Sequence, residues 1–386
     1  MKKIRLGDIA TLITKGTTPT TIGFSFVDTG VNFVKIESIS ENGEFLSDKF
    51  AHITDECDNK LKRSQLEEND ILFSIAGAIG RTAIVPRSIL PANTNQALAI
   101  IRIPQNAINL RFVLYALQSQ AVEEQSEKQK QGVAQLNLSL KNIADILIPL
   151  VSSEKQDEIV RNLAAVDTAI AIRKEQIRLI DQVVKSRFIE LFGDPQRNPH
   201  GYKHTKLSDI ATYYNGLTYK PENVAAEGTI VLRSSNIQNS QLDFADTIRV
   251  DCAIKERLMV QKNDILMCSR NGSAKLVGKV ALIKDIQELM SFGAFMMIIR
   301  SHYFGYLMTY FQMDAFRQQI KTGATTTINQ ITGRMLDDVT IPLPPMALVD
   351  QFAAFVEQTD KSKLAVQKGL QELEILKKSL MQQYFG

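Results

Sequence analysis

The chain has 386 residues, of which 44% are hydrophobic and 23% are charged, and its formal net charge is +3. This length allows two or three domains with well-formed cores, and no apolar run reaches the roughly 18 residues that a membrane span requires. The three scattered cysteines exclude a disulfide framework and a zinc site, so we expect reduced thiols, a cytoplasmic location and no membrane partner.

Residues 1–150 are predicted to form a mixed α/β domain. Short, apolar and β-branched segments at 70–74, 81–85 and 98–103 are bounded by Gly, Pro or Asn, which is typical of strands and turns. A helix is expected from residue 110 to about residue 127.

Residues 151–193 are predicted to form one long helix. No Gly or Pro occurs between Glu154 and Phe192, and Ser152 and Ser153 offer an N-cap. About 39 helical residues would extend roughly 58 Å at 1.5 Å per residue. Apolar residues recur at alternating steps of three and four, which makes a heptad seam; they are Leu163, Val166, Ile170, Ile177, Ile180, Val184 and Leu191.

Residues 194–346 and 347–386 repeat these two segments. Ile148–Leu150 and Ile341–Leu343 lie 193 positions apart, and 386 is twice 193. The other matches are Leu6–Ala10 with Leu207–Ala211, Asn69–Leu72 with Asn263–Leu266, and Gly80–Val85 with Gly278–Ile283. The second helix carries its own seam at Phe352, Val356, Val366, Leu370, Leu373, Leu380 and Tyr384. Because such self-similarity determines architecture, we expect two copies of one unit.

The repeat predicts an α+β fold with an internal pseudo-two-fold, or circular, repeat. Two similar mixed α/β domains would be joined by two long antiparallel coiled-coil helices that bury each other's seams. In the alternative, each seam packs on its own globular domain. That alternative is disfavoured because a helix of this length would extend beyond a domain of about 150 residues.

The order of the segments is similar to that of a known family. Each globular segment precedes a long helix that closes in Leu191–Pro195 or Tyr384–Gly386, and the stretches Leu6–Lys15, Asn69–Gly80 and Gly132–Leu150 have partners in the second half. The whole chain thereby resembles the specificity subunit of type I restriction-modification enzymes.

The resemblance implies a function and partners. Residues 1–150 and 194–346 would be target-recognition domains, each reading one half of a bipartite site on double-stranded DNA. The helices at 151–193 and 347–386 would be spacers that set the gap between half-sites and dock two methyltransferase (modification) subunits. Those subunits would carry S-adenosylmethionine and methylate adenine N6, and restriction (translocase) subunits would join for cleavage. The chain itself would be non-catalytic, with no cofactor and no metal.

The motifs of the sequence agree with a non-catalytic chain. Asn198–Gly201 lacks the second proline and the aromatic residue of an adenine-methyltransferase clamp. Gly272–Lys279 differs from a nucleotide-binding loop, because five residues instead of four separate its glycines and Val280 replaces Ser or Thr. The histidines have no ligand partners at metal spacing; they are His52, His200, His204 and His302.

Base edges in DNA are read by Arg, Asn, Gln, Lys, Ser and Thr on loops or strands that enter a groove. We expect these readers at polar turns where the two halves of the chain differ, because different half-sites need different readers. Candidates in the first half are Lys15, Thr17, Thr18, Lys35, Ser74, Lys128, Lys130 and Gln135. Candidates in the second half are Thr218, Tyr219, Lys220, Arg233, Ser235, Asn236, Ser269, Arg270, Asn271, Ser273, Lys275, Thr325, Thr326 and Thr327. Lys128 and Lys130 are expected on phosphates, which carry no sequence information.

The sequence alone leaves another class of function open. The main alternative is a coiled-coil interaction adaptor, whose two related domains bind protein instead of DNA. The near-neutral charge of residues 1–150 supports this alternative, because any DNA affinity must then come from local patches or from a partner. A fused methyltransferase is disfavoured by the missing clamp and the missing glycine-rich loop.

Overall fold

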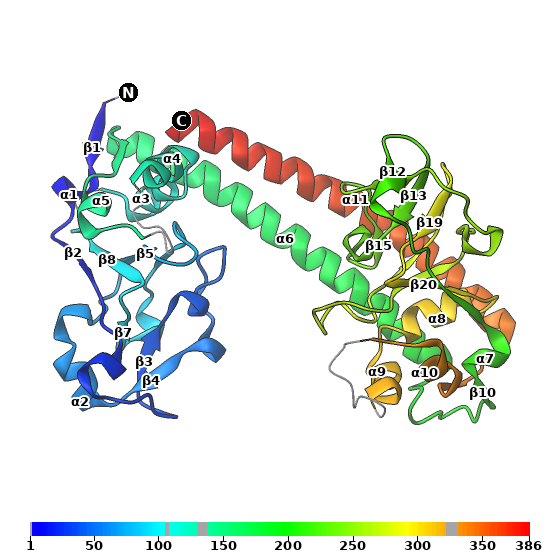
Figure 1. Cartoon of the computed structure of the whole chain (residues 1–386). Coiled ribbons are helices and arrows are strands. Elements are labelled where there is room, and N and C mark those ends of the chain that lie inside the picture. The colour runs from blue at the N-terminus through cyan, green and yellow to red at the C-terminus, as the bar shows by residue number, and fades with distance from the viewer. Residues whose placement is uncertain (1, 105–107, 130–136, 322–329) are drawn as a thin grey trace. The chain divides into compact units, whose positions relative to one another are not determined.

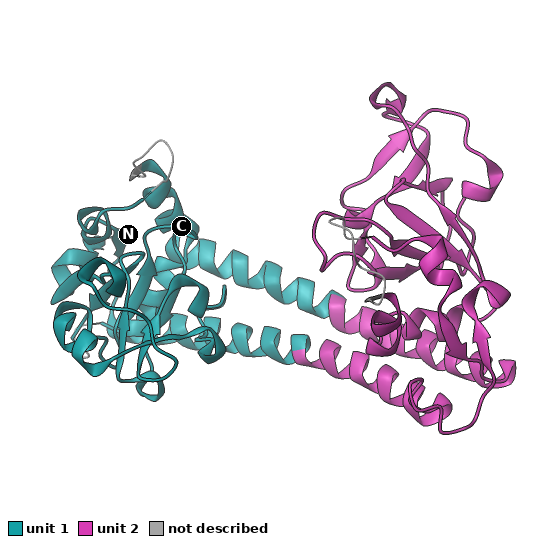
Figure 2. Cartoon of the chain, turned by 60° about the horizontal axis from the view of Figure 1, so that its bottom comes forward, with its two compact units in different colours: residues 1–174, 368–386 teal, residues 175–367 magenta. Residues whose placement is uncertain are grey.

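The computed structural model describes residues 2–104, 108–129, 137–321 and 330–386. The chain divides into two compact units, and each unit takes part of both long helices (Figure 2). Unit 1 comprises residues 1–174 and 368–386, and unit 2 comprises residues 175–367. The segments expected from the sequence, 1–150, 151–193, 194–346 and 347–386, divide the chain at the ends of the long helices and not within them. These boundaries stay a prediction.

Unit 1 is built from short strands and short helices (Figure 1). Its strands are β1 (Lys3–Arg5), β2 (Leu12–Lys15), β3 (Val31–Val34), β4 (Ala51–Ile53), β5 (Ile71–Ser74), β6 (Thr82–Ile84), β7 (Ala92–Thr94), β8 (Leu98–Arg102) and β9 (Leu147–Pro149). Its short α-helices are α1 (Leu6–Ile9), α2 (Asp55–Lys60), α3 (Leu110–Leu117), α4 (Gln120–Gln129) and α5 (Leu140–Ala144).

Unit 1 is organised by an antiparallel sheet in the order β2-β8-β5-β6. Side chains alternate across a strand, so Ile71 and Phe73 of β5 enter one hydrophobic core while Leu72 enters another. The first core also contains Phe112 of α3. A second sheet, β4-β3-β7, and the pair β1-β9 complete the unit.

Unit 2 repeats this plan. Its strands are β10 (His204–Lys206), β11 (Thr212–Asn215), β12 (Val224–Ala225), β13 (Thr229–Leu232), β14 (Ile237–Gln238), β15 (Gln241–Leu242), β16 (Ile248–Val250), β17 (Ile265–Cys268), β18 (Val280–Leu282), β19 (Met290–Phe292), β20 (Met296–Arg300) and β21 (Thr340–Pro342). Its short α-helices are α7 (Leu207–Ile210), α8 (Phe304–Tyr310), α9 (Asp314–Lys321) and α10 (Gly333–Asp337). The sheet β11-β20-β17-β18 corresponds to β2-β8-β5-β6. In the sheet β12-β16-β13-β19, the strands β16-β13-β19 correspond to β4-β3-β7.

The prediction of a single helix at residues 110–127 is wrong, because the structure has two helices there, α3 and α4. The Ser119 hydroxyl donates to the carbonyl of Ala116 at the end of α3 and accepts from the Val122 amide in α4. The corresponding stretch of unit 2 is likewise divided into α8 and α9. A side-chain hydrogen bond of this kind competes with the helical backbone bonds, but the break does not require it, because Met313 stands before α9.

The two long helices are α6 (Ser153–Phe192) and α11 (Met346–Phe385). They run antiparallel within each unit, because residue numbers rise along one helix as they fall along the other. In unit 1, Asn162 bonds Tyr384 and Asp167 pairs with Lys377. In unit 2, Asp181 pairs with Lys363, and the rings of Phe188 and Phe352 lie 5.6 Å apart. No helix in the described ranges is long and apolar enough to cross a membrane.

Candidate nucleic-acid interface

Four loops of unit 2 meet at one end of its main sheet. The antiparallel pairing places Cys268, at the end of β17, opposite Met296, at the start of β20, and Asn215 of β11 opposite Met297. The amide of Leu217 donates to the carbonyl of Phe292, and that of Gly293 donates to Leu232 at the end of β13. We call these loops, residues 217–220, 233–236, 269–275 and 293–295, the unit 2 rim.

Unit 1 has an equivalent frame, in which the Leu98 amide donates to Asn95 as the Met296 amide donates to Gly293. The amide of Gly16, after β2, donates to the carbonyl of Asn95, and that of Ile75, after β5, donates to Ala97. The hydroxyl of Thr94 donates to the carbonyl of Val34, at the end of β3. We call residues 16–18, 35–38, 75–78 and 95–97 the unit 1 rim.

Equivalent glycines allow the loops of each rim to approach closely. A Cβ atom on Gly16 would lie 1.8 Å from the carbonyl oxygen of Thr94, and one on Gly216 would lie 2.2 Å from that of Gly293. These distances are far shorter than a van der Waals contact, so a side chain at either position would force the loops apart. The frame of each rim therefore depends on a glycine directly after the first sheet strand.

Many of the predicted DNA-binding residues lie on the rims or directly beside them. The fully or partly exposed ones are Thr17, Thr18 and Lys35, with Lys15 at the end of β2, in unit 1, and Thr218, Tyr219, Lys220, Arg233, Ser235, Arg270, Asn271, Ser273 and Lys275 in unit 2. Sequence reasoning thus points to loops that the structure brings together.

Three predicted residues are buried and bonded internally. The hydroxyl of Ser74 donates to the carbonyl of Ala76, and that of Ser269 donates to Phe295. The Asn236 amide donates to the carbonyls of Asp243 and Asp246. These side chains shape the loops, because their polar groups are already satisfied within the protein.

Some of the other predicted residues lie elsewhere. Lys128 is exposed near the end of α4, a helix that contacts the backbone of Leu147 in β9 through Gln125. Lys130, Gln135, Thr325, Thr326 and Thr327 lie outside the described residues.

The polar side chains of the unit 2 rim bond to one another and to residues beside the rim. The guanidinium of Arg233 pairs with Asp246 at 2.7 Å, and the Asn271 amide donates to the Ser234 hydroxyl at 3.3 Å. Within the described residues, the Nε of Arg233 and the Oγ of Ser235 are buried without a hydrogen-bond partner. Most buried polar atoms are satisfied, so this loop keeps unused hydrogen-bonding capacity.

Three rim-associated residues were not singled out from the sequence. Gln96 of the unit 1 rim accepts a hydrogen bond from the Thr18 hydroxyl. Phe295 of the unit 2 rim is 58% exposed, and Gln330 accepts a hydrogen bond from Arg270. The sequence could have indicated Phe295, because it places an aromatic residue in a short turn between two strands. Gln96 and Gln330 are identified only by their contacts with residues distant in the sequence.

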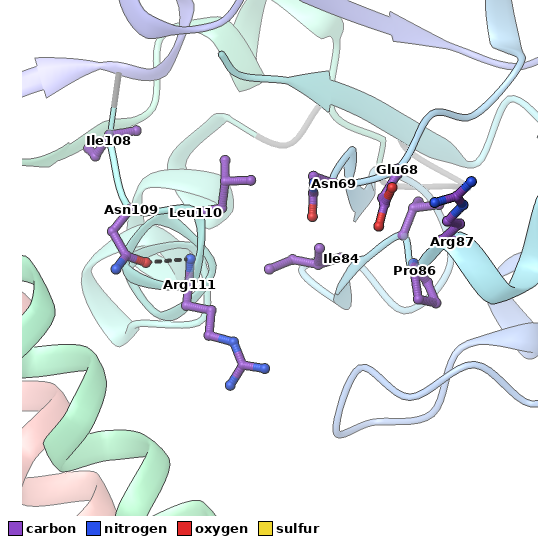
Figure 3. A pocket seen from close by; sticks show the side chains of 10 residues that line it. Glu68, Asn69, Ile84, Pro86, Arg87, Ile108, Asn109, Leu110 and Arg111 are labelled. Carbon is purple, nitrogen blue, oxygen red and sulfur yellow. Dashed lines mark hydrogen bonds between the residues drawn. The ribbon is translucent and has the colours of Figure 1, made fainter. Parts of the chain in front are cut away.

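A separate cavity of about 670 Å³ lies in unit 1 (Figure 3). It is lined by residues 68–69, 84–87 and 108–111, and Arg87 and Arg111 stand on opposite sides of it. Asn69 precedes β5, whereas the rim begins after the last residue of that strand, Ser74. The cavity therefore lies at the other end of the strand from the unit 1 rim.

The described residues show no cluster typical of a metal centre. They contain no group of three or more His, Cys, Asp and Glu side chains that could hold a metal ion. Gly278 has a φ of +81° and its amide donates to Cys268, so Gly272–Lys279 forms the turn that leads into β18. This geometry suits a glycine turn before a strand.

Comparisons with known proteins agree on one family. A family model described as the type I restriction modification DNA specificity domain matches residues 1–182 and 199–375. The EcoKI specificity subunit of Escherichia coli K12, a type I restriction enzyme subunit, is 28% identical over 178 residues, covering 43% of this chain and 38% of that protein. The EcoBI specificity subunit of Escherichia coli is 35% identical over 136 residues, covering 35% of this chain and 28% of that protein. The chain thus matches well under half the length of these relatives.

Solved structures share the fold over nearly their whole length. The S subunit of a type I restriction-modification system from M. genitalium aligns with a TM-score of 0.53 and 14% identity, covering 100% of this chain and 96% of that one. A chain from a type I restriction-modification assembly aligns with the same TM-score, 18% identity and coverage of 100% and 97%. These neighbours confirm the expected mixed α and β fold with two related domains. The chain belongs to the type I restriction-modification DNA specificity family.

Proposed function

We propose that this chain is a sequence-specific DNA-binding subunit in which each unit reads one half of a bipartite site. The observation that carries the proposal is that the two rims share one backbone frame but present different polar side chains. Two copies of one frame can be placed on DNA in the same way, while different side chains select different base pairs. Family membership favours this function over the protein-binding adaptor.

We further propose that the base contacts come from the exposed rim residues. Arg270, Asn271, Ser273 and Lys275 stand on one loop of unit 2, and Thr17, Thr18 and Gln96 stand together in unit 1. Buried Ser74, Asn236 and Ser269 would support the loops. Lys15, Lys35, Lys128 and Lys220 would add phosphate contacts, which strengthen binding without selecting a sequence.

The chain would perform no chemistry itself. Two methyltransferase subunits carrying S-adenosylmethionine would dock on the long helices, and restriction (translocase) subunits would join for cleavage. Both helices leave apolar side chains exposed, which supports a docking role. These are Ile172, Leu179 and Val183 on α6, and Leu364, Ile375 and Leu376 on α11. The helices would also set the gap between the half-sites.

The experiment that tests this function is methylation mapping. The chain is co-expressed with an adenine methyltransferase of a type I system, and methylated adenines are located across the host genome. We expect one bipartite motif with a fixed gap, and no motif when either protein is expressed alone. Co-purification of the pair without any motif would instead support the protein-binding adaptor.

A further inference from the structure

The side chain of Arg270 is held in an exposed position by two neighbours. Its guanidinium carbon lies 5.8 Å from the centre of the Phe295 ring, and its Nη2 donates to the Oε1 of Gln330 at 2.8 Å. The backbone amide of Arg270 also donates to the carbonyl of Phe295. An arginine fixed by a ring face and an amide loses less side-chain entropy when it binds a ligand.

The matching positions of unit 1 carry neither an arginine nor an aromatic ring. The amides of Ile75 and Ser269 donate to Ala97 and Phe295, and the carbonyls of Ile75 and Ser269 accept from Leu138 and Ile331. Counting from these bonds, the neighbours equivalent to Arg270, Phe295 and Gln330 are Ala76, Ala97 and Asn137. The backbone is shared and Asn137 keeps an amide, so the arginine and the aromatic ring are the additions specific to unit 2.

The chemistry of this trio indicates its ligand. Part of the guanidinium remains available beside the bond to Gln330, and two parallel N–H groups of arginine match the O6 and N7 acceptors of guanine. A phosphate could also accept these bonds, but Lys275 on the same loop already offers an exposed charge for the backbone. Both units have this rim backbone, but only unit 2 carries the arginine. Such a contact suits a base pair that is present in one half-site and absent from the other.

We infer that Arg270 reads one guanine in the half-site recognised by unit 2, and that Phe295 and Gln330 are positioning residues for it. The inference rests on the proposed DNA-recognition function. It also predicts that the guanine contact is absent from the half-site read by unit 1, because Ala76 has no hydrogen-bonding side chain.

The test uses the complete chain with its methyltransferase and compares methylated motifs. Arg270→Ala should lower discrimination at one G·C pair of one half-site by about 5- to 150-fold, the range expected for a good bidentate contact. Phe295→Ala and Gln330→Ala should give smaller losses at that same pair. Gln96→Ala is the matched control on the other rim and should leave that pair unchanged.

Two further readouts separate a base contact from the alternatives. Arg270→Lys should fail to restore discrimination, because an ammonium cannot form the two-point contact. In Arg270→Ala the salt dependence of binding should stay the same, because a base contact neutralises no phosphate. Equal weakening at all sequences, rescue by Lys and a salt slope lower by about 1 would show a phosphate contact and overturn the inference. An unchanged motif, or a change at an A·T pair, would also overturn it. If the wild-type chain directs no bipartite motif, the proposed function itself fails.

Discussion

The carboxylate of Asp264 accepts two hydrogen bonds from the guanidinium of Arg300, at 2.7 and 2.8 Å. Asp70 and Arg102 form the same pair in unit 1, at the same two distances. Each aspartate also accepts a hydrogen bond from the backbone amide three residues before it. Each follows an asparagine with a positive φ. The repeat thus extends to an ion pair that fastens a turn to the neighbouring strand in both units.

The pair in unit 1 predicts a loss of stability. The Asp70 side chain is fully buried, so Asp70→Asn would leave part of the Arg102 charge without its partner. We expect a loss of about 3 kcal/mol, or roughly 6–12 °C in the midpoint of thermal unfolding. Glu67→Gln is the control, because Glu67 meets the same arginine but is 63% exposed, and it should cost less than about 1 kcal/mol. Equal effects of the two changes would contradict the role given to burial.

A second ion pair predicts an asymmetric response. The Lys363 side chain is 7% exposed in the helix pair of unit 2, while its partner Asp181 is 52% exposed. Asp181→Ala leaves a buried ammonium unpaired and should lower the free energy of unfolding by about 2 kcal/mol. Lys363→Met leaves only a solvated carboxylate, so it should change stability by less than about 1 kcal/mol. Urea denaturation of both variants checks the order, and a larger loss for Lys363→Met would show it to be wrong.

The cysteines should differ in reactivity. Burial, with the nearby charges of Asp58 and Glu56, raises the pKa of the Cys57 thiol, and burial raises the pKa of Cys268. A raised pKa lowers the thiolate fraction at neutral pH, and the thiolate is the reactive form. Cys252 is only partly buried. Iodoacetamide at pH 7.5 should therefore modify Cys252 first in the folded chain. Comparable rates for Cys57 or Cys268, measured by mass spectrometry, would contradict the burial described here.

The helices and strands were largely predictable because their signals are local. The β-branched segments at 70–74 and 98–103 became β5 and β8, and the seam residues of both long helices are buried or half-buried. The break between α3 and α4 was not predictable, since residues 110–127 contain no Gly or Pro that would end a helix, and Ser119 bonds to both helices only in the folded chain.

The candidate interface was predictable only in part. Polar turns mark the loops, but they do not tell which side chains point inward, as those of Ser74 and Asn236 do. Gln96 joins the unit 1 rim through Thr18, 78 positions away in the sequence. Such neighbours arise from the pairing of distant strands, which single-sequence patterns do not specify.

The spacer role predicts a change of gap when α6 is lengthened. Four residues inserted after Gln176 add about 6 Å of helix. Since B-DNA rises about 34–36 Å per 10–10.5 base pairs, the gap should grow by at most about two base pairs, with both half-site sequences unchanged. The insertion also rotates the seam by about 40°, so weaker activity is expected. Replacing residues 173–176 by the inserted sequence, without a change of length, is the control.

Methylation mapping reports the outcome of the insertion. A longer gap in the insertion variant alone would support the spacer role. An unchanged gap with intact activity, or altered half-site sequences, would contradict it.

The central claim is that each unit reads its own half-site, and one measurement tests it most directly. Methylated motifs are mapped for the wild-type chain, for Gln96→Ala in the unit 1 rim and for Arg270→Ala in the unit 2 rim, all with the same methyltransferase. We predict relaxed selectivity at one or two base pairs in each variant, with the two variants affecting opposite half-sites and leaving the gap unchanged. Changes in the same half-site, or equal weakening across the whole motif in both variants, would contradict the claim.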